Sequence, residues 1–333
     1  MLQLFLFFLV IPTLLCAVPI DIVYTWVDGS DPNWRAIYNC FAGKQSDFAT
    51  DAVDACRFAA QDELKYSLRS ICKYAPFFNH IYIITMNQKP SWLKPHPQVT
   101  IIDHKTIFPK AEDLPTFNSQ AIESNLHRIP GLSEYFIYFN DDVFLGRSVT
   151  PGDFFTEEGK VKVLFESMLS PSGPRNPEKY ETTYRISWRN TNWVLDQRYR
   201  VERRYRLCHA PFAYRKSFFE FSEEMFPEVF ASNASHRFRD VRDFNLINGF
   251  LQYHWTYENK AVNGQMSNQM ITIRDDPMLP KTQRAIDELK ACIPHTFCIQ
   301  DNVTNNGVQS RALLHDFLEG LYPDPAPWEL AEQ

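Results

Sequence analysis

The chain has 333 residues, of which 44% are hydrophobic and 15% aromatic, enough to bury a sizeable core in one large α/β domain or two lobes. Its 34 basic and 40 acidic residues give a formal net charge of -6 and a pI near 5.9. This composition excludes a disordered chain, and without a global basic field we expect no nucleic-acid partner.

The first segment, residues 1–17, is apolar and carries no charged side chain. It resembles the core of a secretory signal and is shorter than the ~20 residues that span a membrane. We therefore expect a signal peptide or a short signal anchor, a protein of the secretory pathway (ER or Golgi lumen) or a secreted one, and membrane attachment only if the segment is uncleaved. Its removal leaves six cysteines, an even number compatible with disulfides.

Strands and helices alternate in the first half of the chain. β-Branched and aromatic runs indicate the strands, and apolar residues at helical spacing between caps and prolines indicate the helices. The predicted elements are a strand (20–27), a helix (62–74), two strands (80–85 and 99–102), a helix (118–130) and a strand (135–139). This order predicts an α/β layer sandwich of the nucleotide-binding type.

The last of these strands runs directly into Asn140, Asp141 and Asp142. Because side chains alternate along a strand, we expect Asn140 and Asp142 to point one way and Asp141 the other. One face then offers two oxygen ligands of the kind that Mg²⁺ and Mn²⁺ prefer and share with substrate phosphates. Asn and Asp also favour turns, so these residues alone fit a metal site and a polar turn equally well.

Ligands of open α/β sheets bind beyond the carboxyl ends of the strands. Residues 86–88 and 140–142 follow two predicted strands and are expected to flank one crevice. The chain has 11 glycines and neither a GxGxxG nor a GxxxxGK(S/T) motif, which argues against a dinucleotide-binding fold and a P-loop NTPase.

The composition changes after residue 150. Residues 151–207 are rich in Arg and Tyr, and we interpret them as a loop-rich insertion or lid. Most of its arginines are expected on a solvated face in ion pairs, and a minority to clamp an anionic substrate. Further helices are predicted at 218–226, at 244–257 and from residue 310.

Four sequence blocks, taken in order, resemble the signature regions of the Stealth proteins. This family includes bacterial capsule sugar-phosphate transferases and the precursor of the animal enzyme that tags lysosomal glycoproteins with N-acetylglucosamine 1-phosphate. The match covers most of residues 18–326 and is highly specific. The blocks are 20–29; 62–71 with 114–119, 121–124, 127–129 and 139–142; 209–239; and 297–302 with 317–323.

The resemblance implies transfer of a hexose 1-phosphate, typically N-acetylglucosamine 1-phosphate, from a UDP-sugar donor to a hydroxyl of a glycan or glycoprotein acceptor, with release of UMP. It implies a Mg²⁺ or Mn²⁺ cofactor and a nucleotide-sugar-binding, Rossmann-like (GT-A-like) layer sandwich with a loop-rich and helical C-terminal part. The single catalytic domain at 18–333 would comprise a nucleotide-sugar-binding part (18–150), the insertion or lid (151–207) and a catalytic and closing helical part (208–333).

Two candidate catalytic residues come from the third block. His209 matches the family's histidine and is our candidate base, because an imidazole pKa of ~6.5 suits proton transfer near neutrality. Arg239 resembles the arginine that serves the phosphoryl group, and its planar fork fits phosphate oxygens. Without the resemblance, we would interpret His209 as structural and Arg239 as the ion-pair partner of Asp240.

The cation is assigned first to Asp142, which we also count as catalytic, and second to Asp141. Asp301 of the fourth block is a third candidate ligand, from the other part of the domain. The family has Asn-Asp-Asn there, whereas this chain has Gln300 before Asp301. Two further residues have predicted supporting roles, Asn140 at the strand end and Glu123, which we expect to share a helix face with His127.

The nucleotide-sugar end is assigned to Trp26, Asp28, Arg57 and Asn87. Trp26 would pack on the uracil or the sugar, with core packing as the alternative, and Arg57 would meet the diphosphate. Asp21 is assigned to the same end and counted as catalytic, because a carboxylate in an apolar strand needs a partner.

Two other functions fit parts of the pattern. A conventional metal-dependent glycosyltransferase would use the same strand end but attack the anomeric carbon, leaving both phosphates on the nucleotide. A secreted, non-catalytic sugar-binding relative would keep the fold without the chemistry. His209 and Arg239 within one matching block favour the sugar-phosphate transferase.

Overall fold

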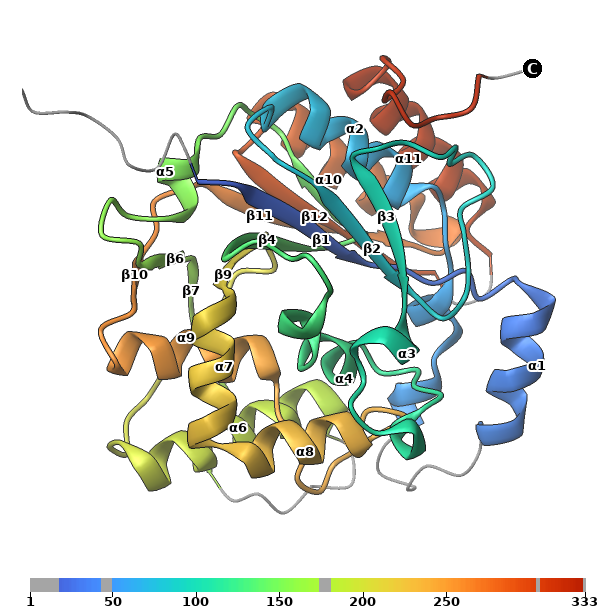
Figure 1. The fold of residues 1–333 in the computed structure, drawn as a ribbon. Coiled ribbons are helices and arrows are strands. Elements are labelled where there is room, and N and C mark those ends of the chain that lie inside the picture. Colours follow the sequence, from blue (N-terminus) through green and yellow to red (C-terminus); the bar gives the residue numbers. More distant parts are fainter. Residues whose placement is uncertain (1–17, 43–49, 174–180, 304–305, 332–333) are drawn as a thin grey trace, which may run out of the picture.

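A computed structural model describes residues 18–42, 50–173, 181–303 and 306–331 of the chain (Figure 1). The apolar segment 1–17 lies outside the described residues, so its role as a signal or anchor stays a prediction. No helix in the described ranges is long and apolar enough to cross a membrane.

A five-stranded sheet forms the centre of the molecule, in the order β3-β2-β1-β4-β9. Its first four strands are parallel and the fifth is antiparallel to β4. The strands are β1 (Ile20–Thr25), β2 (Ile81–Thr85), β3 (Val99–Asp103), β4 (Tyr135–Asn140) and β9 (Phe212–Arg215). β1 and β2 are buried along their whole length, as expected for parallel strands covered on both faces. The predicted α/β layer sandwich is confirmed.

Helices cover both faces of this sheet. Figure 1 shows α2, α10 and α11 above it, and α4 and α6 to α9 below it. The α-helices are α1 (Pro32–Phe41), α2 (Glu63–Tyr74), α3 (His104–Ile107), α4 (Ser119–Glu123), α5 (Pro151–Phe154), α6 (Thr183–Arg198), α7 (Lys216–Met225), α8 (Pro227–Ser235), α9 (Ile247–Tyr257), α10 (Leu279–Ala291) and α11 (Val308–Leu321). The predicted helices near 62–74, 218–226, 244–257 and from 310 are confirmed.

A second, three-stranded sheet continues from the end of β4. It has the order β11-β12-β5 and consists of β5 (Val143–Leu145), β11 (Asn268–Arg274) and β12 (Thr296–Asn302). Its apolar side chains form a core of their own with α2, α10 and α11. Two smaller pairs complete the strands, β6 (Val161–Val163) with β10 (Ala261–Asn263) and β7 (Phe165–Leu169) with β8 (Tyr205–Leu207).

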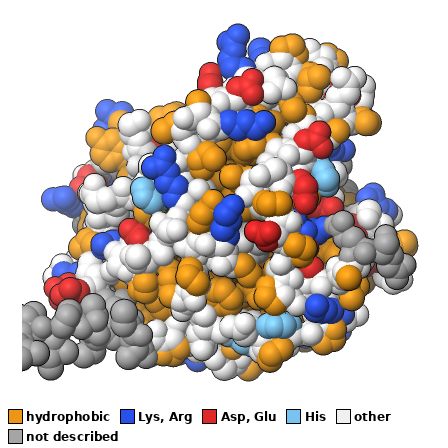
Figure 2. All heavy atoms as spheres, turned by 90° about the horizontal axis from the view of Figure 1, so that it is seen from above, with side chains coloured by type: hydrophobic (Ala, Val, Ile, Leu, Met, Phe, Trp, Pro, Cys, Tyr) orange, Lys and Arg blue, Asp and Glu red, His pale blue; other side chains and the backbone are white. Residues whose placement is uncertain are grey.

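The face seen from above carries acidic and basic side chains interspersed with apolar ones (Figure 2). Charges of one sign do not gather into a single field on this face. This mixture agrees with the small net charge of the sequence.

Two predictions about local structure are wrong. The stretch 151–207 is not loop-rich, because it contains α6, whose Trp188 and Leu195 are fully buried. The helix escaped prediction because polar residues occupy many of its buried positions; Asn190 Nδ2, for example, donates to the carbonyl of Phe244 at 2.7 Å. The helix predicted at 118–130 ends at Glu123, and only a short 3₁₀ turn follows it (Leu126–Arg128).

Candidate functional site

The carboxyl end of β4 lies in the middle of the sheet, next to the end of β1. Asn140 is the last residue of β4 and pairs with Thr25 of β1. Asp141 and Asp142 form the turn between β4 and β5. The expectation that they point to opposite faces assumed an extended strand, and that assumption does not hold beyond Asn140. The sequence fits a metal site and a polar turn equally well, and the two are compatible here. The two aspartates lie in a turn and also face other polar groups.

Three potential metal-binding side chains meet at this turn: Asp142, His209 and Cys298. One donor atom of each lies within 4.8 Å of the other two. His209 Nε2 is 3.3 Å from Asp142 Oδ1, and the Cys298 thiol donates to Asp142 Oδ2 at 3.4 Å. Among the described residues, no well-aligned hydrogen bond reaches the buried Oδ1. A carboxylate oxygen in that position is available to a cation.

Strand pairing explains why these residues meet. β9 is antiparallel to β4, with Phe212 opposite Tyr138, so the residues that precede β9 lie beyond the carboxyl end of β4. His209 is one of them. β12 is antiparallel to β5 with Cys298 opposite Val143, which brings the thiol next to Asp142. The two chain segments thus reach the turn from different sheets.

Charged neighbours set the protonation of this group. Burial lowers the pKa of His209, but the charge and hydrogen bonding of Asp142 outweigh it and raise the pKa above its usual value. Burial raises the pKa of Asp141 to about 7, and the charge of Asp142 adds to this effect. Burial also raises the pKa of the Cys298 thiol. Burial therefore favours the neutral, protonated forms of Asp141 and Cys298.

Glu63, in the first turn of α2, belongs to the same electrostatic cluster. Burial raises its pKa to about 8, with a further contribution from the charge of Asp141. The sequence showed Glu63 only as an acidic residue at a helix start. Acidic residues are common there because they interact favourably with the helix dipole. Cys298 was missed as well, because only the strand pairing brings it to Asp142.

Glu123 faces the site from the end of α4. Burial raises the pKa of Glu123 to about 7, and the charges of Arg239 and His209 partly offset this shift. Its Oε1 accepts a hydrogen bond from Gln120 Nε2 at 2.8 Å. The predicted shared face with His127 is wrong, since α4 ends before His127, which instead stacks on Phe219 and contacts Glu223 at 3.0 Å.

Arg239 supplies a positive charge next to these carboxylates. Burial lowers its pKa to about 10, and the charge of Arg57 adds to this effect. Its Nη2 donates to Ser119 Oγ at 3.2 Å. Within the described ranges it forms no ion pair, so the expected partnership with Asp240 is absent; Asp240 instead pairs with Arg242 at 2.8 Å. A desolvated guanidinium of this kind is suited to an anionic ligand.

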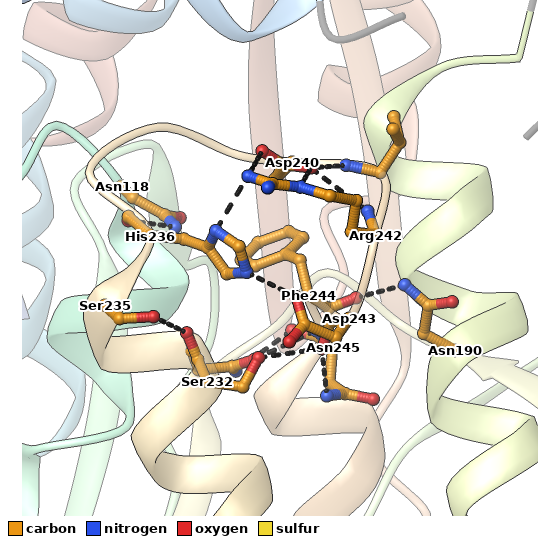
Figure 3. A network of polar contacts seen from close by, with 12 residues as sticks. Asn118, Asn190, Ser232, Ser235, His236, Asp240, Arg242, Asp243, Phe244 and Asn245 are labelled. Carbon is orange, nitrogen blue, oxygen red and sulfur yellow. Dashed lines mark hydrogen bonds and ion pairs between the residues drawn. The ribbon is translucent and has the colours of Figure 1, made fainter. Parts of the chain in front are cut away.

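The segment that carries Arg239 is fixed by a polar network (Figure 3). Asn118 Nδ2 donates to the carbonyl of His236 at 2.9 Å, and the His236 ring contacts Asp243 at 2.8 Å. Phe238 stacks on Phe117 with ring centroids 5.0 Å apart. The segment is therefore docked against the N-terminus of α4, which also carries the Arg239 partner Ser119.

Arg57 lies close enough to Arg239 for their charges to interact. It is held by Asp51, whose Oδ2 is 2.9 Å from Arg57 Nη2. The same carboxylate accepts a hydrogen bond from Thr183 Oγ1 at 2.9 Å, at the start of α6. Arg57 thus adds a second positive charge within electrostatic reach of Arg239.

The other residues assigned to the donor end follow β1 and β2, at the carboxyl end of the sheet. Asp28 Oδ1 accepts a hydrogen bond from the amide of Ser30 at 2.8 Å and so holds its own turn. Asn87 is exposed and has a positive φ of 54°. Trp26 is partly buried against the main core, which agrees with the packing alternative.

Asp21 does not belong to the site. It is fully buried and accepts hydrogen bonds from Asn79 Nδ2 at 2.8 Å and from the amide of Ser133 at 2.7 Å. It is the second residue of β1, so it lies roughly 13 Å along the strand from Thr25 at about 3.3 Å per residue. The partner expected for a buried carboxylate is present and is structural, and Asp21 is not among the side chains that meet at the turn.

Asp301 is not part of the group formed by Asp142, His209 and Cys298. Its Oδ2 is 3.2 Å from Arg311 Nη2, and its Oδ1 accepts a hydrogen bond from the amide of Val303 at 2.7 Å. Cys298, three residues earlier on β12, takes the place that we expected for Asp301. The six cysteines among the described residues are all free thiols.

Family models of the Stealth proteins match the chain in four places. Conserved region 1 matches residues 18–38, region 2 residues 57–163, region 3 residues 208–258 and region 4 residues 287–333. Asp142 lies in region 2, His209 and Arg239 lie in region 3, and Cys298 lies in region 4. Similarity thus extends over the segments that form the site.

Curated relatives include exopolysaccharide phosphotransferases. One from Streptomyces coelicolor is 37% identical over 319 residues, which is 95% of this chain and 53% of the relative. CpsY from Mycobacterium tuberculosis is 34% identical over 315 residues, which is 93% of this chain and 58% of the relative. The chain thus spans about half the length of the curated relatives it matches.

Solved structures give weaker similarities. The galactosyltransferase LgtC is matched with a TM-score of 0.42 and 13% identity, over 93% of this chain and 99% of that one. Mouse xyloside xylosyltransferase 1 is matched with a TM-score of 0.37 and 10% identity, over 76% and 88%.

Proposed function

This chain belongs to the Stealth family, and we propose that it is a sugar-phosphate transferase that moves a hexose 1-phosphate, N-acetylglucosamine 1-phosphate in the first instance, from a UDP-sugar to a hydroxyl of a glycan acceptor. The observation that carries the proposal is the 3.3 Å contact of His209 with Asp142, within electrostatic reach of Arg239, which forms no ion pair among the described residues. Exopolysaccharide phosphotransferases among the relatives support the reaction class.

The reaction needs a base, and we assign this role to His209. In our proposal the acceptor oxygen attacks the phosphorus next to the sugar, and the bond from that phosphorus to the bridging oxygen breaks. The acceptor proton passes to His209 Nε2, and UMP leaves with the bridging oxygen. Asp142, 3.3 Å from that nitrogen, stabilises the imidazolium that forms when the proton is transferred.

The transferred phosphoryl group gains negative charge that must be stabilised, and we assign this role to Arg239 with help from Arg57. Both are positively charged, and Arg239 lies in a desolvated position where its interaction with an anion is strengthened. Glu123 interacts electrostatically with both Arg239 and His209. We propose that Glu123 positions these two side chains.

The residues at the turn fit a divalent cation. Asp141 and Asp142 are adjacent carboxylates, the Asp142 Oδ1 accepts no well-aligned hydrogen bond from the described residues, and Glu63 lies within electrostatic reach. Mg²⁺ or Mn²⁺ held by Asp141 and Asp142 would supply positive charge to the diphosphate of the donor. The hard-cation ligands in this proposal are oxygen atoms alone.

The cation proposal predicts a pH-dependent effect on stability. The folded-state pKa values of Asp141, Glu63 and Glu123 lie at about 7, 8 and 7, above those of unfolded carboxyls. The folded state therefore binds more protons, and without a cation its stability should fall as pH rises from about 5 to about 8. Mg²⁺ or Mn²⁺ should raise the unfolding temperature more at about pH 8 than at about pH 5.5, because the carboxylates are charged there.

Thermal unfolding of wild type and Asp141→Asn, each with and without cation, tests this prediction. The variant should show a smaller loss of stability with pH and a smaller cation effect. Equal cation effects at the two pH values in wild type would argue against a carboxylate site at the turn.

Product analysis tests the reaction itself. The purified chain, with UDP-N-acetylglucosamine, Mg²⁺ or Mn²⁺ and simple glycosides, should release UMP and form a sugar phosphodiester visible by mass and by phosphorus NMR. Asp142→Asn provides the matched inactive control. Release of UDP in place of UMP would instead support the conventional glycosyltransferase, and donor binding without any product would support the non-catalytic relative.

A further inference from the structure

The ligand set at the turn is not the one that a hard cation prefers. Asp142 offers oxygen, but His209 offers a ring nitrogen and Cys298 a sulfur. Mg²⁺ binds oxygen ligands and usually keeps several waters, whereas nitrogen and thiolate ligands favour Zn²⁺ and related ions. These three residues therefore have a different metal preference from Asp141 and Asp142 as a pair.

The distances fit a tetrahedral ion. Two ligands placed ~2.0–2.1 Å from zinc at the tetrahedral angle lie roughly 3.3–3.4 Å apart. His209 Nε2 and Asp142 Oδ1 are already 3.3 Å apart, and the Cys298 sulfur lies within 4.8 Å of both chosen donor atoms. With Zn–S at ~2.3 Å, the sulfur belongs roughly 3.6 Å from the other two donors, so it would have to approach them by at most about 1.2 Å.

The burial of the three residues leaves one position open. Cys298 is fully buried in β12, whereas the side chains of His209 and Asp142 are 37% and 28% exposed. An ion held here would have three protein ligands and its solvent side free for a fourth, which is the arrangement of an open zinc site.

We propose that Asp142, His209 and Cys298 form a binding site for a soft divalent cation of the Zn²⁺ type, and that its occupation inhibits the enzyme. The inhibitory part rests on the proposed function. A cation on His209 Nε2 takes up the lone pair that would accept the acceptor proton. It also engages Asp142, which the proposed Mg²⁺ or Mn²⁺ site needs. One ion therefore competes with both the base and the hard cation.

Cobalt spectroscopy tests the ligand set without any turnover. Co²⁺ added to the cation-free wild type should give a sulfur-to-cobalt charge-transfer band and the strong visible absorption of a tetrahedral site. Cys298→Ser and His209→Ala should lose these features. Cys292→Ser, which removes an exposed thiol just before β12, is the matched control and should retain them. A wild-type spectrum without a charge-transfer band, or a band that survives in Cys298→Ser, would overturn the proposal.

Inhibition by Zn²⁺ tests the consequence. With Mg²⁺ in excess, micromolar Zn²⁺ should inhibit the wild type and Cys292→Ser, and Cys298→Ser should require at least about tenfold more Zn²⁺. Unchanged Zn²⁺ sensitivity in Cys298→Ser would refute the inhibitory role. Failure of the proposed function would look different, because UMP release would then be absent at every Zn²⁺ concentration while the cobalt spectrum stayed intact.

Discussion

His209→Ala is expected to abolish turnover while leaving the affinity for the UDP-sugar within about tenfold, roughly 1.4 kcal/mol. The base is needed only when the acceptor hydroxyl loses its proton, so its removal should lower kcat and not donor binding. The variant loses the 3.3 Å contact with Asp142, and the His209 side chain is partly exposed, so the fold should tolerate the change. Initial rates of UMP release and a donor-binding isotherm measure the two quantities.

A matched histidine variant separates the chemistry from the loss of an imidazole. His315 is exposed on α11 and contacts the Tyr66 hydroxyl at 3.1 Å, away from the turn. His315→Ala should keep wild-type turnover. Wild-type turnover in His209→Ala would remove this residue from the mechanism, and a donor affinity lowered by far more than tenfold would make it a binding residue.

The sequence predicts the sheet but not all the contacts at its end. The strands 20–27, 80–85, 99–102 and 135–139 were recognisable because buried parallel strands are continuous apolar runs. Positions beyond strand ends follow from the topology, and this directed attention to Asn140, Asp141 and Asp142. The pairing of Cys298 with Val143 cannot be predicted from a local sequence pattern, because β12 and β5 are more than a hundred residues apart in the chain.

For Asp21, the sequence predicted a chemical need but not the position of the residue relative to the ligand. A carboxylate inside an apolar strand needs a partner, and the sequence supported that argument. It did not show which end of the strand the carboxylate occupies relative to the ligand. Asn79 and the Ser133 amide satisfy Asp21 at the amino-terminal part of β1, whereas ligands bind at the carboxyl end. Chemical need and position on the strand are separate questions, and only the first is readable from residue type.

Arg239→Ala is expected to lower kcat by about 10³, because an arginine that stabilises phosphoryl charge is worth that much or more. Unlike the paired arginines at 57, 69, 189 and 204, Arg239 has no carboxylate partner among the described residues, so its charge is available to a ligand. Arg239→Lys keeps the charge but loses the planar fork, so it should recover only part of the activity.

Stability must be measured beside activity, because Arg239 is desolvated next to Glu123. The control is Arg242→Ala on the same segment, since the Arg242 side chain is 73% exposed and pairs with Asp240. It should keep turnover within a few fold, so a loss confined to the Arg239 variants at similar unfolding temperatures would assign the effect to the phosphoryl group. Equal losses in both variants would instead mean that the segment only has to be ordered, and Arg239 would then be a structural residue. The network of His236, Asn118 and Asp243 holds the backbone without the Arg239 side chain, which is why we expect the first result.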